Sequence, residues 1–568
     1  MKYSGARILI ETLIEQGVDT IFGYPGSAIL NIYDELYNYR DRIRHILVSH
    51  EQHAAHAADG YARSSGRVGV CLATSGPGAT NLVTGIATAF ADSSPVVAIT
   101  GNVSIPLLGK DSFQEVDIAG ITMPIVKHNW IVKDARDLAE IIREAFFVAK
   151  SGRPGPVLVD IPKDISSALC EYDEGRNNSQ ALKSRAERLL EKTKRETFTE
   201  ADFEKAVSLI MSSKRPVLYA GGGVISSGAG AQLKKLAELL GAPVALSLMG
   251  MGAFPCEHPL STGLVGMHGT TASNKAVQKA DLLIAAGSRF SDRVTSSVER
   301  FAPSAKIIHI DIDQAEINKN VGTDVSIAGD LKLVLDRLVK KLPQKLITEW
   351  NGEIDKWKAE IPNDHHRKTA LHPRFVIRET AKALGEKTVV ATDVGQHQIW
   401  TAQFYPFKNP RSFLSSGGMG TMGFGMGAAV GAKIANPGAP VVLFTGDGCF
   451  RMDCAEMATM VKYRLPVLIV IFNNRTLGML RQWQNFFYKS RYSQTDLDDR
   501  GPDFIRLAAA YDVQGFRVTD EASFLQALDK GMGLLAFGKP VLIEAVIDKD
   551  ERVLPMVPGG KPVDEQIM

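Results

Sequence analysis

Two short segments in the last third of the chain constrain its fold more than any other feature. Residues 441–446 are apolar and run into a Gly-Asp-Gly triplet centred on Asp447, and residues 468–472 are apolar and run into an Asn-Asn pair ending at Asn474. A helix between two such strands makes a right-handed crossover, which leaves the strands parallel with their carboxyl ends at one sheet edge. Asp447 and Asn474 are therefore expected to converge, although 27 positions separate them.

The residues at these strand ends suit a metal ion and a diphosphate. The carboxylate of Asp447 and the amide oxygen of Asn474 are hard donors of the kind that Mg²⁺ prefers. Gly446 and Gly448 allow a tight turn and a close approach of backbone N–H groups to phosphate, helped by the next helix, which we expect to start near Met452. The pattern resembles the signature of thiamine diphosphate (ThDP) enzymes, whereas a Gly-Asp-Gly triplet alone also fits an ordinary strand-to-helix turn.

Composition narrows the class of protein. The chain has 568 residues, of which 45% are hydrophobic, and this length exceeds what one core supports. Its 65 basic and 63 acidic residues give a net charge of +2, which argues against a nucleic-acid-binding protein. The sequence shows no apolar run of membrane-spanning length, no signal-peptide layout, and no disulfide or zinc spacing among five cysteines. We expect a cytoplasmic protein without nucleic-acid or membrane partners.

Short apolar strands alternate with helices along the chain, which is typical of α/β proteins, and two charged stretches divide the pattern into three segments. The first and third segments echo each other, since the glycine-to-proline interval is 19 positions from Gly76 and 20 from Gly446. We predict an α/β fold of three doubly wound parallel-sheet domains. Their expected ranges are 1–170, 198–342 and 369–550, with linkers at 171–197 and 343–368 and a tail at 551–568.

Glu51 lies where a ThDP enzyme requires an acid. Residues 45–50 are expected to form a short strand, and Glu51 to open the following helix at the edge of the sheet. A desolvated glutamate with a raised pKa can protonate the aminopyrimidine ring of the cofactor and turn its amine into a base. The alternative is a first-turn carboxylate favoured by the helix dipole, beside a capping box that starts at Ser49. The histidines around Glu51 have the wrong spacing for a zinc site.

Further motifs narrow the resemblance to one family. Besides Glu51 and the ThDP signature, the chain has characteristic residues at 23–28, 110–115, 162–164 and 267–270, Arg-Phe-x-Asp-Arg at 289–293, and Gly-Met-x-x-Gln-Trp at 478–483. Over nearly its whole length it resembles catalytic subunits of the acetohydroxyacid synthase (acetolactate synthase) family. The resemblance implies pyrimidine-binding, FAD-binding and diphosphate-binding domains in this order. ThDP is expected between the first domain of one subunit and the third of its partner, in a homodimer or homotetramer.

The resemblance also assigns roles to individual residues. Asp447, Asn474 and the main-chain oxygen of Thr476 are expected to bind Mg²⁺, and Glu51 to activate the cofactor. Met422 is expected to hold ThDP in a V-shaped conformation. The other residues expected at ThDP are Pro25, Gly26, Val394, Gly395, Gln396, His397, Gly420, Gly446, Gly448, Cys449 and Met479. Those expected to line the substrate entrance or take part in catalysis are Phe113, Gln114, Lys163, Trp483 and Met479.

Three of these positions carry alternatives. Met422 by itself is better explained as a core residue. Trp483 matches the tryptophan that favours 2-ketobutyrate as second substrate, where a flat wall discriminates one methylene by about 1–3 kcal/mol, but it also fits a packed aromatic anchor. Ser27 stands where glycine is common in the family, so its side chain could narrow the pocket or alter a main-chain donor of that loop.

The middle segment has features of a nucleotide site. Glycines follow apolar strands at 221–223 and at 287, and Asp311 ends another strand, although no strict Gly-x-Gly-x-x-Gly is present. These residues alone indicate only a nucleotide-like site. The resemblance implies FAD, held by Gly221, Gly222, Leu248, Met249, His268, Gly287, Arg289, Arg293, Asp311 and Asp330.

The function implied by the resemblance is acetolactate synthesis. Pyruvate is decarboxylated through ThDP, and the hydroxyethyl carbanion condenses with pyruvate or 2-ketobutyrate, the first common step of branched-chain amino-acid biosynthesis. The alternative is a flavin-dependent pyruvate oxidase, against which Trp483 and the motif at 289–293 argue. A non-catalytic homologue is disfavoured because Glu51, Asp447 and Asn474 are intact. The tail is too short for a ligand-binding domain, so we expect a separate small regulatory subunit.

Overall fold

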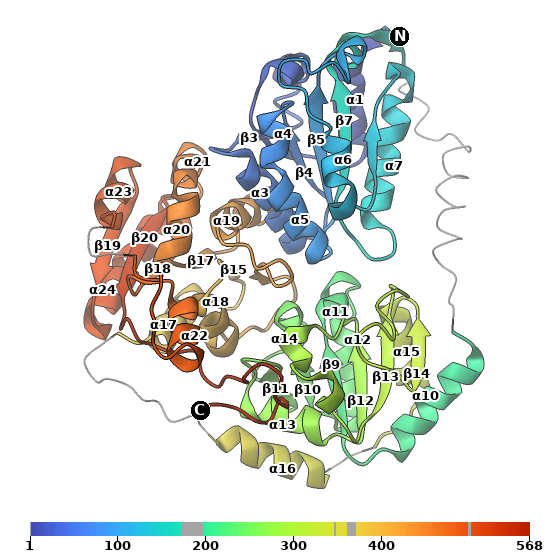
Figure 1. The fold of residues 1–568 in the computed structure, drawn as a ribbon, viewed down its shortest axis with the longest axis vertical. Coiled ribbons are helices and arrows are strands. Elements are labelled where there is room, and N and C mark those ends of the chain that lie inside the picture. Colours follow the sequence, from blue (N-terminus) through green and yellow to red (C-terminus); the bar gives the residue numbers. More distant parts are fainter. Residues whose placement is uncertain (1, 173–197, 346–347, 361–370, 498–500) are drawn as a thin grey trace.

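The computed structural model describes residues 2–172, 198–345, 348–360, 371–497 and 501–568. Within these residues the chain forms three parallel six-stranded sheets, each flanked by helices, which occupy three corners of the molecule (Figure 1). The predicted α/β fold with three doubly wound sheets is confirmed, while the domain boundaries stay predictions. No helix in the described part of the chain has the length and apolar character needed to cross a membrane.

The first sheet has the order β3-β2-β4-β5-β7-β6. Its strands are β2 (Thr20–Gly23), β3 (Arg44–Leu47), β4 (Gly69–Ala73), β5 (Val96–Asn102), β6 (Asn129–Ile131) and β7 (Val157–Pro162). The helices are α1 (Gly5–Glu15), α2 (Leu30–Asn38), α3 (Glu51–Ser65), α4 (Pro77–Asn81), α5 (Val83–Ala91), α6 (Ile118–Thr122), α7 (Leu138–Lys150) and α8 (Lys163–Ser167). An antiparallel pair, β1 (Lys2–Ser4) with β8 (Leu169–Glu171), joins the two ends of this unit.

The third sheet has the order β16-β15-β17-β18-β20-β19. Its strands are β15 (Val389–Thr392), β16 (Phe413–Leu414), β17 (Val441–Gly446), β18 (Val467–Asn473), β19 (Gln514–Val518) and β20 (Val541–Val546). The helices are α17 (Pro373–Leu384), α18 (Gln396–Phe404), α19 (Gly425–Ala435), α20 (Asp447–Asp453), α21 (Met457–Lys462), α22 (Gly478–Phe487), α23 (Phe504–Ala510) and α24 (Glu521–Ala536). Counted along the chain, both sheets follow the order 2-1-3-4-6-5, so the predicted echo is confirmed.

The middle sheet follows a different order, β11-β10-β9-β12-β13-β14, which is the dinucleotide-binding arrangement 3-2-1-4-5-6. Its strands are β9 (Pro216–Ala220), β10 (Val244–Leu246), β11 (Ser261–Leu264), β12 (Leu282–Ala286), β13 (Lys306–Asp311) and β14 (Val325–Ala328). The helices are α10 (Glu200–Ser212), α11 (Gly222–Ser226), α12 (Gly230–Leu240), α13 (Thr271–Lys279), α14 (Asp292–Thr295) and α15 (Leu331–Lys341).

The two predicted linkers differ in what the structure describes of them. Of the first, 171–197, all but the first two residues lie outside the described residues. The second, 343–368, contains helix α16 (Thr348–Ala359). Its Trp350 is buried against the middle sheet and donates from Nε1 to the carbonyl of Pro216 (3.2 Å), so this part of the linker belongs to the core of the middle unit.

Helices α3 and α19 interlock the first and third units. Small residues face each other where they cross: a Cβ added at Gly60 would lie 2.3 Å from the carbonyl oxygen of Ala428, and one at Gly431 would lie 1.9 Å from that of Ala57. Only glycine allows the two backbones to approach so closely. One hydrophobic cluster runs through this crossing and holds both units together.

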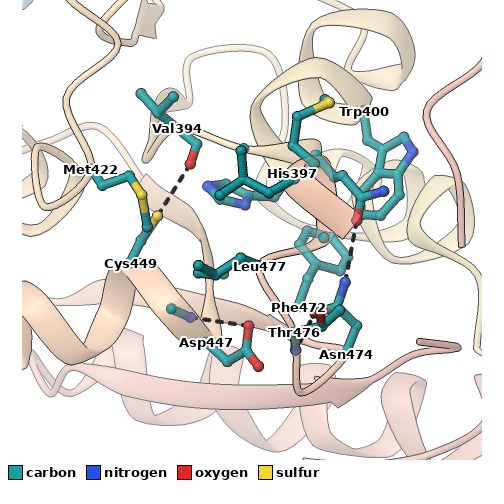
Figure 2. A pocket seen from close by; sticks show the side chains of 17 residues that line it. Val394, His397, Trp400, Met422, Asp447, Cys449, Phe472, Asn474, Thr476 and Leu477 are labelled. Carbon is teal, nitrogen blue, oxygen red and sulfur yellow. Dashed lines mark hydrogen bonds between the residues drawn. The ribbon is translucent and has the colours of Figure 1, made fainter. Parts of the chain in front are cut away.

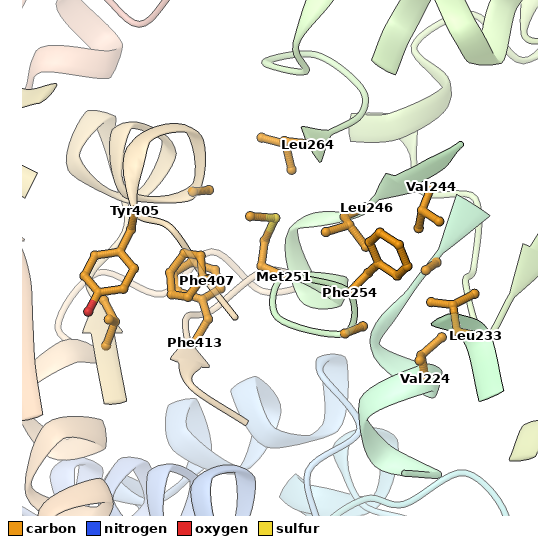
Figure 3. Packing of buried hydrophobic residues seen from close by; sticks show 14 of the residues in the cluster. Val224, Leu233, Val244, Leu246, Met251, Phe254, Leu264, Tyr405, Phe407 and Phe413 are labelled. Atoms are coloured by element: carbon orange, nitrogen blue, oxygen red, sulfur yellow. The ribbon is translucent and has the colours of Figure 1, made fainter. Parts of the chain in front are cut away.

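A second shared core joins the middle and third units (Figure 3). Phe254 and Met251 from the middle unit lie in the same cluster as Phe407 and Phe413, whose rings are 4.9 Å apart. The backbones of the two units are also joined, because the N–H of Cys256 donates to the carbonyl of Phe407 (3.0 Å). The middle unit is therefore fixed to the unit that carries the Gly-Asp-Gly segment.

The crossing of α3 and α19 leads to a prediction about stability. Gly431→Ala gains about 0.5–1 kcal/mol of helix propensity but places its methyl group against the Ala57 backbone, an overpacking cost of about 1–3 kcal/mol. The net effect should be a lower thermal unfolding midpoint by scanning calorimetry. Gly352→Ala is the matched control, since that helical glycine has open space around it and the same change should raise the midpoint slightly. Equal effects of both variants would contradict the close crossing.

Candidate active site

A cavity of about 80 Å³ lies at the carboxyl edge of the third sheet (Figure 2). It is at the point where the strand order reverses, between β15 and β17, which is where α/β sheets bind ligands. The parallel pairing of β17 with β18 brings Asp447 and Asn474 to this edge, as predicted. The lining residues are Val394, Gly395, Gln396, His397, Trp400, Met422, Gly446, Asp447, Gly448, Cys449, Phe472, Asn474, Thr476, Leu477, Gly478, Met479 and Leu480.

Asp447 is the first residue of α20, so the expectation that this helix starts near Met452 was wrong. An acid in the first helical turn is favoured by the positive end of the helix, and the turn at Gly446 lets the helix start directly at the strand end. Its Oδ1 accepts a hydrogen bond from the N–H of Gly448 (3.0 Å). Its Oδ2 is buried without a hydrogen-bond partner in the described structure, and burial raises the Asp447 pKa to about 7.

An unpartnered buried carboxylate oxygen is costly unless a cation pairs with it, so its position favours a metal ligand. Asn474 and Thr476 line the same cavity from the turn after β18, where Arg475 adopts a positive φ of 56°. The Oδ1 of Asn474 accepts from the N–H of Thr476 (3.2 Å). The three residues predicted to bind Mg²⁺ are thus brought together, and their oxygen donors suit that ion.

Two helices begin at this cavity and present backbone N–H groups to it. Helix α18 starts at Gln396, after Gly395, and α20 starts at Asp447. Cys449 donates from Sγ to the carbonyl of Val394 (3.2 Å), which ties the two loops together. Burial lowers the pKa of His397 to about 3, so its ring is neutral, and its Nε2 has no hydrogen-bond partner among the described residues. This arrangement suits a diphosphate group.

The loop that carries Met422 is held by a buried acid that sequence analysis did not identify. Asp393, at the end of β15, accepts hydrogen bonds from the N–H groups of Gly423 (2.8 Å) and Gly425 (3.1 Å). It also accepts from the hydroxyl of Thr445 (2.9 Å). These bonds fix the loop so that Met422 lines the cavity, whereas Gly420, predicted at the same site, is exposed outside the lining.

The residues predicted in the first unit form a separate group. Glu51 begins α3, as predicted, and its Oε2 accepts from Asn81 (2.9 Å). The alternative capping box at Ser49 was wrong, because His50 caps the helix through Nδ1 and Ser49 donates to the carbonyl of Ala455. The expected desolvation of Glu51 stays a prediction, since this side chain is only partly buried in one chain.

This first group surrounds the loop at Gly76 and Gly78. A Cβ on Gly78 would lie 3.2 Å from Oε1 of Glu51, one on Gly76 would touch Gln114, and one on Gly26 would touch Thr74. Lys163 begins the helix after β7, and Phe113 is 86% exposed. None of the residues predicted in the first unit (Pro25, Gly26, Glu51, Phe113, Gln114 and Lys163) lines the third-unit cavity.

The two site residues predicted on helix α22 differ in position relative to the cavity. Met479 lines the cavity, whereas the ring of Trp483 lies against Phe487 at 5.2 Å and outside the lining. The role of Trp483 at the substrate stays a prediction. Sequence analysis missed five lining residues: Trp400, Phe472, Leu477, Gly478 and Leu480. Trp400 could have been predicted from helical spacing, because it lies one turn after Gln396 on α18 and therefore on the same helix face.

The middle unit presents its own cradle where its strand order reverses, between β9 and β12. The N–H of Gly223 donates to the carbonyl of Gly287 (2.9 Å), and a Cβ on Gly221 would lie 2.2 Å from that oxygen. Asp311 ends β13, and burial raises its pKa to about 6. The other predicted residues lie at or after the carboxyl ends of these strands: Gly222, Leu248, Met249, His268, Arg289, Arg293 and Asp330.

Two of these residues have structural partners of their own. Asp330 caps α15 by accepting from the N–H of Leu333 (3.1 Å), and the ring of His268 is buried 3.3 Å from the carbonyl of Pro555. Closely packed glycine turns where the strand order reverses, with an acid at a neighbouring strand end, fit the dinucleotide-binding arrangement. It does not distinguish one dinucleotide from another.

Comparison with known proteins agrees with this geometry. Models of the thiamine pyrophosphate enzyme family match its N-terminal TPP binding domain at 3–121, central domain at 203–338 and C-terminal TPP binding domain at 393–545. The probable acetolactate synthase large subunit of Methanocaldococcus jannaschii is 48% identical, covering 98% of this chain and 94% of its own. The acetolactate synthase large subunits of Cyanidium caldarium and Corynebacterium glutamicum are 45% and 46% identical, each over 98% of this chain and over 95% and 89% of their own. The chain therefore belongs to the acetolactate synthase large-subunit family of thiamine diphosphate enzymes.

Proposed function

We propose that this chain is the catalytic subunit of an acetolactate synthase. It would decarboxylate pyruvate and join the remaining two-carbon unit to a second pyruvate or to 2-ketobutyrate. The observation that carries the proposal is the buried, unpartnered Oδ2 of Asp447 beside two helix N-termini, in a chain whose relatives are named for this activity. No observation favours the alternative of a flavin-dependent pyruvate oxidase.

Asp447, Asn474 and Thr476 would hold Mg²⁺, and the N-termini of α18 and α20 would hold the diphosphate of ThDP. Mg²⁺ would neutralise diphosphate charge and fill the position that Asp447 Oδ2 leaves without a partner. Bound there, ThDP supplies the electron sink that decarboxylation of a 2-ketoacid needs. Met422, fixed through its loop by Asp393, would support the bent cofactor from one side.

Glu51 would hold and move a proton at the pyrimidine ring. Asn81 occupies Oε2 of Glu51, which leaves Oε1 for the cofactor. Removal from water by the cofactor and a second subunit would disfavour the charged form of Glu51, so that its carboxyl could hold the proton that it passes to the pyrimidine ring. Phe113, Gln114 and Lys163 lie in the same unit and would border the substrate.

The two halves of the site would meet in a homodimer. Both units expose large apolar side chains: Phe113 and Met123 on the first unit, and Met419 and Leu480 on the third. Exposed apolar groups of this kind mark surfaces that a partner covers. The first unit of one copy would cover the third unit of the other, in a dimer or a tetramer built from such dimers.

We propose FAD for the crevice of the middle unit, with the glycines against its phosphates and Asp311 at a ribose. A small regulatory subunit is proposed because the relatives are named as large subunits; co-purification with such a subunit tests it.

A cytoplasmic location is supported by five cysteines that are all free of disulfides, as expected in a reducing compartment.

The activity itself is tested by a pyruvate assay. Purified protein should release CO₂ and form acetolactate, measured as acetoin after acid treatment. Omission of ThDP or of Mg²⁺, after dialysis against a chelator, should abolish product. Hydrogen peroxide formation in place of acetolactate would favour the oxidase instead.

The two-chain site is tested by complementation between variants. Glu51→Gln cannot cycle the proton, and Asp447→Ala removes a metal ligand, so each variant alone should be nearly inactive with an intact fold. A mixed dimer would contain one site with both changes and one site with neither. When both variants are co-expressed at equal levels, about half of the dimers are mixed, so roughly a quarter of all sites should be restored. Mixed dimers purified through two separate tags should have about half of their sites intact. A site formed within one chain would give no recovery, because every chain carries one defect.

Trp483 is tested by competition between second substrates. If it contacts the extra methylene of 2-ketobutyrate, Trp483→Leu should shift products toward acetolactate by roughly 10-fold or more, since one methylene is worth about 1–3 kcal/mol. Phe487→Leu, which removes only the ring packed against Trp483, is the control. An unchanged product ratio in Trp483→Leu would make Trp483 a structural residue.

A further inference from the structure

A chain of buried amides leads from the cavity to the C-terminal segment. Gln482 is only 4% exposed and is the one buried residue of helix α22. Asn474 donates from Nδ2 to Oε1 of Gln396 (3.2 Å), and Gln396 donates from Nε2 to Oε1 of Gln482 (3.1 Å). Gln482 in turn donates from Nε2 to the carbonyl of Val553 (3.0 Å). Each link is a single side chain.

The same amides hold the C-terminal segment on the third unit. Oε1 of Gln482 also accepts from the N–H of Val553 (2.9 Å), so its amide pairs with Val553 as a neighbouring strand would. Gln396 donates to the carbonyl of Glu551 (2.7 Å), and Trp400 donates to that of Arg552 (3.2 Å). Two of the three residues that bind the segment, Gln396 and Trp400, also line the cavity.

The chain fixes the orientation of Asn474. An amide donates only from nitrogen and accepts only at oxygen. Because Nε2 of Gln482 donates to the carbonyl of Val553 and to Sδ of Met556, its Oε1 is the group left to meet Gln396. This turns the nitrogen of Gln396 toward Gln482 and its oxygen toward Asn474. Asn474 must then present Nδ2 to Gln396, which directs its Oδ1 away from Gln396, toward the N–H of Thr476. Reversal of any one amide would place two donors or two acceptors against each other.

We propose that Gln482 is a positioning residue that keeps the amide oxygen of Asn474 available to the metal ion, and that it couples filling of the site to docking of residues 551–553. The inference rests on the proposed function, because it takes Asn474 as a metal ligand. Coupling is reciprocal: a bound ion fixes Asn474 and so favours the docked segment, and the docked segment favours metal binding by the same factor. Beyond Val553, the segment continues to the middle unit, where the N–H of Val557 donates to the carbonyl of Met267 (2.7 Å).

Gln482→Leu removes the chain with little change in side-chain volume, and Gln403→Leu is its matched control. Gln403 also grips the segment through Nε2, donating to the carbonyls of Leu554 (3.2 Å) and His268 (3.0 Å), but the structure shows no hydrogen bond from it to Gln396 or Asn474. Each variant loses an amide that donates a hydrogen bond to the backbone of the same segment. Only Gln482→Leu also removes the hydrogen bond to Gln396 that connects Val553 with Asn474.

The first readout is the dependence of ThDP binding on Mg²⁺ concentration, which titration calorimetry measures in the absence of substrate. Gln482→Leu should raise the Mg²⁺ concentration for half-saturation about tenfold, in the range found when a group behind a metal ligand is removed. Gln403→Leu should leave it unchanged. Equal Mg²⁺ dependence in the unaltered protein and Gln482→Leu overturns the positioning role, and an unaltered protein that binds no ThDP overturns the proposed function as well.

The second readout is trypsin cleavage after Arg552, which is exposed at the start of the gripped segment. In the unaltered protein, Mg²⁺ with ThDP should slow this cleavage. Without Mg²⁺ and ThDP, Gln403→Leu should be cut faster than the unaltered protein, and Mg²⁺ with ThDP should slow its cleavage by the same factor as in the unaltered protein. Gln482→Leu should be protected by a clearly smaller factor at saturating Mg²⁺ and ThDP. Equal protection in both variants overturns the coupling. Thermal unfolding midpoints confirm that both variants are folded.

Discussion

The parallel pairing of β17 with β18 sets the positions of most groups at the cavity. Because the strands run side by side in register, the residues that leave their carboxyl ends meet at one edge, and both Asp447 and Asn474 are held there by fully buried strands. The adjacent β15 brings Gln396 and Asp393 to the same edge. Asp447 is then left with a carboxylate oxygen that nothing in the described structure satisfies, an energetic cost that a cation would offset.

The first and third sheets share one strand order but carry different chemistry. The third sheet presents oxygen donors and helix N-termini for a charged group, and the first presents an acid, Glu51, with a lysine and exposed apolar residues. Within one chain, α3 and α19 cross closely, and Glu51 does not line the third-unit cavity. Under the proposed dimer, each copy would supply two half sites, which fits the large apolar side chains that both units expose.

The middle unit is connected to the cavity by more than a shared core. The C-terminal segment is gripped by Gln396 and Gln482 at one end and by the backbone of Met267 at the other. His268, expected at the flavin, contacts this same segment. A ligand bound beside His268 would thus bear on the segment that also reaches Asn474.

Local sequence was enough to determine much of this protein. Strand and helix periods determined the α/β class, the turn residues determined that Asp447 and Asn474 end neighbouring strands, and the echo between segments was confirmed by the shared strand order. The start of α20 was misplaced because a first-turn acid and a glycine turn let the helix begin at Asp447 itself. Only tertiary structure decided that Asp393 holds the Met422 loop, that Glu51 stays outside the cavity, and that Gln482 joins Asn474 to Val553. These hydrogen bonds link residues 30 to 86 positions apart, and a hydrogen bond between distant residues leaves no local periodicity in the sequence.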